Sequence, residues 1–452
     1  MRKTVSNSIA YRLRNTKLPR THLLAVEPFK LSATQTELLT RLGNDLLKFY
    51  RAVNDLYLHS NIDWVRDYLD IGKGDDLIRH ARMKYHKQSI PRIIRPDILI
   101  TNDGFVITEL DSIPGGFGQL DSLSAVYEDA GYNIVGSARG VHSAFASSLC
   151  EASGLDDPVC AIVVSDESAD YLPEMTYLAV ELQKIGLQTH AVHPKEVLFT
   201  EDSLFINVGG GKLQVDIVYR FFELFDLPNI PKSELLLYAA RKKLMAVTPP
   251  CKHFLEEKIL LALLHNEYLR DYWTNSLGNE SFTLLKNTIA PTWIMDNRIV
   301  PPHAEVSGFR WRGKPIRDWR EIIDGTQNQR RLVLKPSGFS PLAWGSKGVK
   351  IGHDMPKSQW AETVETALMS FETSPYVIQP FCDTALFDLE YFDYVDTSHR
   401  HMEARVRLCP YYFVYNNRAN LGGVLATACS KDKKVIHGMT DAIMMPCQSN
   451  IT

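Results

Sequence analysis

Apolar side chains recur at steps of three and four residues between positions 38 and 57, a spacing that predicts an amphipathic helix. Thr34, followed three residues later by Glu37, has the form of a capping box and predicts where that helix starts. The apolar positions are Leu38, Leu42, Leu46, Tyr50, Val53 and Tyr57. We therefore expect residues 1–90 to form a mainly helical segment whose role is packing.

The pattern changes after residue 90, where two strand-like runs flank a turn. Ile98–Thr101 and Phe105–Leu110 lie on either side of Asn102-Asp103-Gly104, a combination typical of a β-hairpin. A glycine-rich turn at 114–118 and a helix from about Asp121 follow. We assign residues 91–157 to this hairpin and the helix behind it.

A β-α-β unit is predicted next, within a small α/β domain over residues 158–230. Val159–Val164 is apolar and β-branched, Glu174–Lys184 has helical spacing, and Leu187–Val192 resumes a strand. Three consecutive glycines at 209–211 indicate a second hairpin that leads into Val215–Tyr219.

Over residues 231–452, helices give way to strands. Ser233–Ala246 and Leu255–Tyr268 have helical spacing. The later segments with strand composition are Leu332–Lys335, Val349–Gly352, Tyr376–Gln379, Arg405–Val414 and Gly423–Ala428. The chain as a whole is predicted to be of the α/β (α+β) class.

The predicted hairpin gathers charged side chains. A three-residue loop at 102–104 pairs Asp97 with Glu109. The same register pairs Arg95 with Asp111, so all four side chains share one face. Nearer the turn, that face would carry Leu99, Phe105 and Ile107.

Three neighbouring carboxylates on this face repel one another unless a cation neutralises them. A hard divalent metal such as Mg²⁺ prefers oxygen ligands, and Arg95 beside it would suit a transferring phosphoryl group. The alternative is an Arg95–Asp111 cross-strand ion pair with solvated neighbours.

A second candidate site follows the strand that ends in Lys335. Gly338, Gly345 and Gly348 punctuate the next loop, and glycines let backbone N–H groups approach phosphate oxygens closely. Lys335 would supply positive charge at the mouth of the strand. The spacing is not that of a Walker A motif, and the alternative is a surface hairpin with a long loop.

Two weaker candidates lie further along the chain. Gln379-Pro380-Phe381 ends a short apolar strand, where free backbone groups could contact an adenine edge; an ordinary strand stopped by proline has the same pattern. Arg405 and Arg407 alternate with apolar residues and therefore share one face of a strand. Two such arginines either bind an anion or form a solvated face.

Charge, composition and missing motifs argue against nucleic-acid-binding proteins, membrane proteins and hydrolases. The 452-residue chain carries 50 Lys and Arg against 53 Asp and Glu, without the basic excess typical of nucleic-acid or anionic-membrane binding. Its seven cysteines form no Cys-x-x-Cys motif, which favours a reducing compartment. The longest apolar run, Ile259–Leu264, is too short to span a membrane. We expect a soluble, cytoplasmic protein, and the lack of Gly-x-Ser-x-Gly and His-Glu-x-x-His motifs argues against hydrolase chemistry.

Taken together, these segments resemble an ATP-grasp enzyme with its elements in circularly permuted order, as in the glutathionylspermidine synthetase family. Arg95-Pro-Asp97 and then Glu109-Leu-Asp111, with Pro114 shortly after, are similar to that family's acidic motif, although the family carries asparagine where this chain has Asp111. The resemblance implies a circularly permuted ATP-grasp fold with an inserted small α/β domain. It also implies that residues 231–452 form the nucleotide-binding half, with a glycine-rich lid.

The resemblance further implies roles for individual residues. Asp97, Glu109 and Asp111 would be Mg²⁺ ligands, and Arg95 would contact phosphate. The residues implied to bind the nucleotide are Lys258, Lys335, Gly338, Gly345, Gly348, Gln379 and Phe381.

A further difference concerns a phosphate-binding arginine of the synthetase, whose place is taken here by Thr427. Arg405, Arg407 or Arg418 is expected to replace it.

The implied activity is that of an ATP- and Mg²⁺-dependent carboxylate–amine ligase, which forms an amide through an acyl phosphate and releases ADP and phosphate. The residues expected to be catalytic are Arg95, Lys335, Arg405 and Arg407. A phosphotransferase on the same fold and a non-catalytic nucleotide-binding protein are the alternatives. The substrates would be a small carboxylate and an amine.

Glu223 and Asp226, near Arg220, could receive a cation, but a place on a helix surface is the preferred interpretation.

Overall fold

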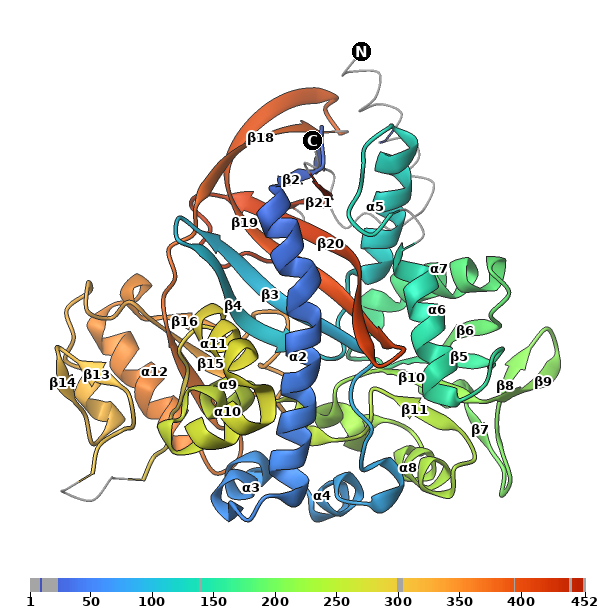
Figure 1. The fold of residues 1–452 in the computed structure, drawn as a ribbon, viewed down its shortest axis with the longest axis horizontal. Helices are drawn as coiled ribbons and strands as arrows, with labels where there is room; N and C mark the ends of the chain where they lie inside the picture. Colours follow the sequence, from blue (N-terminus) through green and yellow to red (C-terminus); the bar gives the residue numbers. More distant parts are fainter. Residues whose placement is uncertain are drawn as a thin grey trace.

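An eight-stranded mixed sheet forms the centre of the computed structural model, which describes residue 9 and residues 23–137, 140–298, 304–393, 395–438 and 441–449 (Figure 1). The strand order is β18-β1-β21-β20-β19-β3-β4, and β2 pairs with β21. The strands are β1 (Leu23–Ala25), β2 (Phe29–Leu31), β3 (Ile93–Thr101), β4 (Gly104–Asp111), β18 (Leu386–Asp393), β19 (Ser398–Tyr415), β20 (Arg418–Ser430) and β21 (Ile443–Ser449).

The 27-residue helix α2 (Ala33–His59) crosses one face of this sheet (Figure 1). Its predicted apolar stripe is confirmed, because Leu42, Leu46 and Tyr50 are fully buried in one core with β3, β19 and β20. The predicted capping box at Thr34 and Glu37 is wrong. Ser32 is the N-cap and exchanges hydrogen bonds with Gln35, so the helix starts directly after β2 and Thr34 already lies inside it.

The remaining N-terminal elements are short. The helices are α3 (Asp63–Asp70), α4 (Asp75–Ala81) and the 3₁₀ turn η1 (Lys84–His86). Between residues 23 and 90 the chain is mainly helical, and β1 and β2 join the central sheet. No helix in the described part of the chain combines the length and hydrophobicity needed to cross a membrane.

Helices α5 (Phe117–Asp129) and α6 (Gly140–Ser153) lie in a second core on the opposite face of the sheet. α5 starts four residues before the predicted Asp121. Gly116 turns the chain at a φ of 97°, and the buried carboxylate of Glu174 accepts hydrogen bonds from Gly116 N at 2.7 Å and Gly118 N at 3.0 Å. A carboxylate from a distant helix therefore occupies this helix N-terminus.

A second sheet is wholly parallel, in the order β11-β10-β5-β6. The strands are β5 (Cys160–Val164), β6 (Thr189–Val192), β10 (Ile217–Phe221) and β11 (Ala246–Thr248). The predicted β-α-β unit is confirmed, with α7 (Leu172–Lys184) between β5 and β6. The helix predicted over Ser233–Ala246 ends earlier, as α8 (Ser233–Lys242), and Ala246 begins β11 instead.

The predicted glycine hairpin is also confirmed, and it joins a small sheet beside the parallel one. Its strands are β7 (Leu198–Phe199), β8 (Leu204–Val208) and β9 (Gly211–Val215). The 3₁₀ turns of this region are η2 (Ala169–Tyr171), η3 (Pro194–Glu196) and η4 (Leu224–Asn229).

A third sheet, β12-β17-β15-β16, is antiparallel and carries the glycine-rich loop. The strands are β12 (Trp293–Ile294), β15 (Leu332–Pro336), β16 (Lys350–Ile351) and β17 (Tyr376–Pro380), with α12 (Lys357–Met369) in the same core. Residues between 265 and 330 complete this unit, because β12 pairs with β17 and Trp319 lies in that core.

The other helices, turns and strands of the C-terminal half lie between residues 253 and 354. They are η5 (His253–Glu256), α9 (Ile259–His265), η6 (Glu267–Leu269), α10 (Arg270–Leu277), α11 (Asn279–Thr288), β13 (Arg310–Trp311), β14 (Lys314–Pro315), η7 (Trp319–Ile322) and η8 (Gly352–Asp354). The proposed division of the chain into domains at residues 90, 157 and 230 stays a prediction.

Gly43 provides a test of how α2 packs on the sheet. A Cβ atom there would meet the fully buried ring of Tyr412, whose hydroxyl donates to Leu39 O at 2.5 Å. Alanine favours a helix over glycine by about 1 kcal/mol, whereas overpacking a core costs about 1–3 kcal/mol. We expect Gly43→Ala to lower the free energy of unfolding measured in urea.

Thr40→Ala is the matched control, on the exposed side of α2 one turn earlier. It should change that free energy by less than about 0.5 kcal/mol. A Gly43→Ala protein as stable as the wild type would contradict this packing.

Candidate active site

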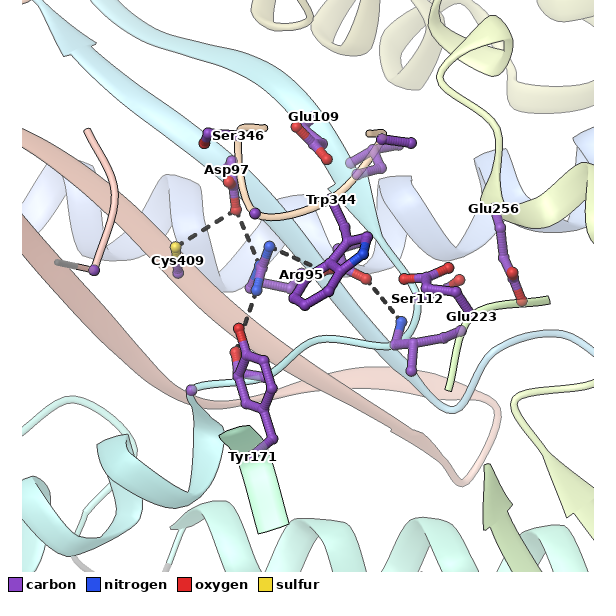
Figure 2. A pocket seen from close by; sticks show the side chains of 18 of the residues that line it. Arg95, Asp97, Glu109, Ser112, Tyr171, Glu223, Glu256, Trp344, Ser346 and Cys409 are labelled. Atoms are coloured by element: carbon purple, nitrogen blue, oxygen red, sulfur yellow. Dashed lines mark hydrogen bonds and ion pairs between the residues drawn. The ribbon is translucent and has the colours of Figure 1, made fainter. Parts of the chain in front are cut away.

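The candidate site is a cavity between the β3–β4 hairpin, the segment after β10 and the glycine-rich loop after β15 (Figure 2). The predicted site residues that line it are Arg95, Asp97, Glu109, Asp111, Lys258, Gly338, Gly345 and Arg407. The structure therefore brings the acidic hairpin together with a lysine and a loop more than a hundred residues away in sequence.

The register of the hairpin is as predicted at the cavity and different at the turn. Asp97 pairs with Glu109 and Arg95 pairs with Asp111, but near the turn Thr101 pairs with Gly104. A β-bulge at Thr108 accounts for the one-residue difference.

The bulge also changes which face the residues of β4 occupy. Phe105 and Ile107 lie in the core under α2, and the extra residue then turns Glu109 and Asp111 toward the cavity. The prediction that Phe105 and Ile107 share a face with the acids is therefore wrong. Leu99 packs separately, against a small cluster that includes Cys429.

The bulge leaves the carbonyl oxygen of Thr108 as a shared acceptor. Lys335 Nζ donates to it at 3.3 Å and Gln379 Nε2 at 3.2 Å. Gln379 also donates to Thr292 Oγ1 at 3.0 Å. This carbonyl therefore ties the third sheet to the hairpin.

Arg95 is held from three sides. Its Nε lies 3.0 Å from Asp97 Oδ1, its Nη2 lies 2.9 Å from Asp111 Oδ2, and its Nη1 donates to Gly115 O at 3.2 Å. The Arg95–Asp111 ion pair that the sequence left as an alternative is thus present. Of its neighbours, Asp97 is buried, whereas the side chain of Glu109 stays partly exposed to the cavity.

Asp97 is buried between two arginines and a thiol. Arg407 Nη1 donates to its Oδ2 at 2.8 Å, and Cys409 Sγ donates to its Oδ1 at 3.5 Å. Burial opposes ionisation, but Arg407 and Arg95 outweigh it and hold the pKa of Asp97 below its usual range. Asp97 is therefore an ionised group that orients both arginines.

In a second group of acids, burial outweighs the nearby cationic side chains. Withdrawal from water, with Glu256 and Asp111 nearby, raises the pKa of Glu223 well above its usual value. Burial likewise raises the pKa of Glu256, although Arg220 pairs with it, and the pKa of Asp111. The interpretation of Glu223 as a helix-surface residue is wrong, because it lines the cavity, whereas Asp226 is buried outside the lining.

Lys258 connects the acidic hairpin to the glycine-rich loop. Its Nζ lies 3.0 Å from Glu109 Oε1 and donates to Ala343 O at 2.8 Å. Glu109 raises the pKa of Lys258 above its usual range despite burial. A cation thus lies between the acid and the loop.

Five predicted site residues do not line this cavity: Lys335, Gly348, Gln379, Phe381 and Arg405. Gln379 is buried, with its side chain bonded as described. Phe381 packs its ring against His353, and Arg405 donates to Lys431 O and Thr384 Oγ1, both at 2.8 Å. The nucleotide roles assigned to these residues stay predictions, as do the metal roles of the acids.

Several lining residues carry no signal in the sequence patterns used above. These are Ser168, Tyr171, Phe222, Glu256 and Trp344. Tyr171 and Glu223 follow the carboxyl ends of parallel strands β5 and β10, where α/β sheets place ligand-binding groups, so the predicted β-α-β unit could have indicated them. Thr427 is fully buried, and its hydroxyl oxygen has no partner among the described residues.

No family model matches the sequence, and no curated protein matches it. Among solved structures, a glutathione synthetase-like effector from Globodera pallida is similar over 99% of this chain and 96% of its own, with a TM-score of 0.58 and 10% identity. A protein described as a γ-glutamylcysteine synthetase, from Methylobacillus flagellatus, covers 90% of this chain and 88% of its own, with a TM-score of 0.44 and 10% identity. The first likeness shows that this chain has a glutathione synthetase-like fold. The permuted order and the inserted domain stay predictions.

A buried ion pair lies next to the lining residues Lys258 and Gly338. Lys73 Nζ lies 2.5 Å from Glu257 Oε1, with the two side chains 1% and 0% exposed. Ser337 Oγ donates to the same carboxylate, and Ser337 O accepts from Lys258 N at 2.9 Å. The pair thus fixes both Lys258 and the first residues of the glycine-rich loop.

Removing one partner of this pair should be costly, because it leaves a buried charge uncompensated. We expect Lys73→Met to lower the free energy of unfolding by about 3–5 kcal/mol, and Lys73→Met with Glu257→Leu to recover part of that loss. Lys184→Met, which removes an exposed pair with Glu181, is the control and should cost less than about 1 kcal/mol. Equal effects of Lys73→Met and the control would contradict the role of the pair.

The raised pKa of Glu223 predicts a pH dependence of stability. The folded state holds this proton more tightly than the unfolded state, whose pKa is near 4.5, so stability falls as the pH rises above that value. Relative to wild type, Glu223→Gln should therefore gain stability between pH 4 and pH 8, on the order of 1.4 kcal/mol for each unit of pKa shift. Urea titrations across this range, with the exposed Glu201→Gln as control, would measure it. A difference between Glu223→Gln and wild type that is constant with pH would contradict the shifted pKa.

Proposed function

We propose that this protein is an ATP- and Mg²⁺-dependent ligase that joins a carboxylate to an amine through an acyl phosphate. The observation that carries the proposal is the charged lining of a cavity within a glutathione synthetase-like fold. Among the described lining residues, apart from His437, five acidic side chains face three cationic side chains. The carboxylates are Asp97, Glu109, Asp111, Glu223 and Glu256.

This lining fits one divalent cation in donor type, because it offers the carboxylate oxygens that such an ion prefers. The described residues contain no ready-made group of three or more metal-binding side chains, so the protein would supply fewer ligands than a closed metal site. Mg²⁺ is commonly bound through one or two carboxylates, with phosphate oxygens and water completing its coordination. Glu109 and Asp111 are the residues that would hold it, because each pairs with one cationic side chain, whereas Asp97 pairs with both Arg407 and Arg95. Bound there, it would neutralise phosphate charge.

The cationic side chains suit the transfer of a phosphoryl group. Arg95, Lys258 and Arg407 line the cavity and present fixed N–H donors to it, and Thr427 adds a hydroxyl. In the proposed reaction a carboxylate oxygen attacks the γ-phosphorus and ADP leaves. The amine nitrogen then attacks the acyl carbon, and phosphate leaves with the displaced oxygen. The glycine-rich loop would keep water away from the acyl phosphate.

The first test is the melting temperature with a non-hydrolysable ATP analogue, with and without Mg²⁺. A ligand at a hundred times its Kd adds about 2.7 kcal/mol, which is roughly 3 °C for a chain of this size. We expect this rise in the wild type with Mg²⁺ and its loss in Glu109→Ala. Asp103→Asn, at the turn of the same hairpin, is the control and should keep the rise. No rise in the wild type, or the same rise in Glu109→Ala, would contradict the proposal.

Product analysis then separates the ligase from its alternatives. With ATP, Mg²⁺ and a panel of carboxylates and amines, a ligase yields ADP, free phosphate and an amide. ADP with a stable phosphorylated product would instead establish a phosphotransferase. Nucleotide binding without either product would establish a binding protein.

A further inference from the structure

The glycine-rich loop contacts the loop between β5 and α7 through one carboxylate. Trp344 Nε1 donates to Glu167 Oε1 at 3.2 Å, and Lys347 Nζ donates to the same oxygen at 3.3 Å. Lys347 Nζ also lies 3.8 Å from the centroid of the Trp344 ring. The indole is thus held at its N–H by Glu167 and covered by a cation.

These contacts place the indole over the cavity. Trp344 is half-buried and lines the cavity, and Figure 2 draws it among the lining side chains. The neighbouring carbonyl of Ala343 accepts from Lys258, so the loop is also fixed on the side of the acidic hairpin. Trp344 therefore sits between two anchors.

The segment that carries Glu167 is itself part of the cavity wall. Ser168 and Tyr171 follow it directly and line the cavity. An exposed ion pair such as Glu167–Lys347 is weak alone. Here, however, the same carboxylate also accepts the indole N–H of Trp344, a lining residue, and so connects the β5–α7 loop to the glycine-rich loop.

We propose that Glu167 is a positioning residue, which holds Trp344 over the cavity and so couples closure of the glycine-rich loop to the β5–α7 wall. One consequence rests on the proposed function. With Glu167 removed, water would reach the acyl phosphate, and ATP would be consumed with less amide formed. The contact itself does not depend on that function.

The contact can be tested without any substrate, by limited trypsin digestion of the full chain. Cleavage after Lys347 requires the loop to leave its docked position. We expect Glu167→Ala to speed this cleavage roughly five- to tenfold, the change that follows from losing one hydrogen bond and one exposed ion pair. Glu167→Gln, which keeps the acceptor for the indole, should give an intermediate rate.

The matched control is Asp166→Ala, on the same loop, whose carboxylate contacts His193 and not the glycine-rich loop. It should be cleaved at the wild-type rate. A second readout is fluorine NMR of protein labelled with 5-fluorotryptophan, in which the Trp344 resonance is assigned by its loss in Trp344→Phe. This resonance should move in Glu167→Ala and stay in place in Asp166→Ala.

The outcomes separate this inference from the proposed function. Equal cleavage rates for Glu167→Ala and Asp166→Ala, with an unmoved Trp344 resonance, would overturn the positioning role even if the nucleotide binds. Faster cleavage of Glu167→Ala in a protein that binds no ATP analogue would leave the positioning role standing and overturn the ligase. If both hold, the ratio of ADP to amide formed should rise in Glu167→Ala and not in Asp166→Ala.

Discussion

The single extra residue in β4 determines where the charges of the acidic hairpin go. Side chains alternate across a strand, so without the bulge at Thr108 the residues Glu109 and Asp111 would point, like Phe105 and Ile107, into the apolar core beneath α2. Two carboxylates there would be buried without partners, which costs several kcal/mol each. The bulge turns them to the cavity and releases the carbonyl that Lys335 and Gln379 share. Both the site and its connection to the third sheet thus depend on one backbone irregularity.

The sequence correctly predicted elements that bury one face, because their apolar residues recur at the period of a helix or form one short run. Helix α2 has one core-facing stripe and β15 one short apolar run, so period and composition identified both. Elements set by distant partners were missed or misplaced. β1 and β2 are three residues each and exist because the distant strands β18 and β21 pair with them. α5 starts early because Glu174 accepts from the first N–H groups of that helix. No local pattern contains that information.

The sequence predicted the candidate site only in part. The predicted pairing of Asp97 with Glu109 is correct although the predicted turn is not, because a shorter loop and the bulge offset one another. Glu223 was predicted to lie on a helix surface, because an acid close to an arginine in sequence is common there. Its importance comes from Glu256 and Asp111, which only the fold brings near it. The sequence could therefore propose the chemistry of the hairpin, but not the full set of charges around it.

The strand order of the central sheet has a consequence for how the chain folds. β1, at residues 23–25, lies between β18 and β21, and β2 pairs with residues 447–449. During synthesis these early strands must wait for partners made more than 350 residues later, while α2 and its neighbours already present apolar surface. Contacts of such sequence separation slow folding and prolong the exposure of unpaired edges. The central sheet is thus complete only once β21, the most C-terminal strand described, has been made, and until then the unpaired strands are exposed to aggregation.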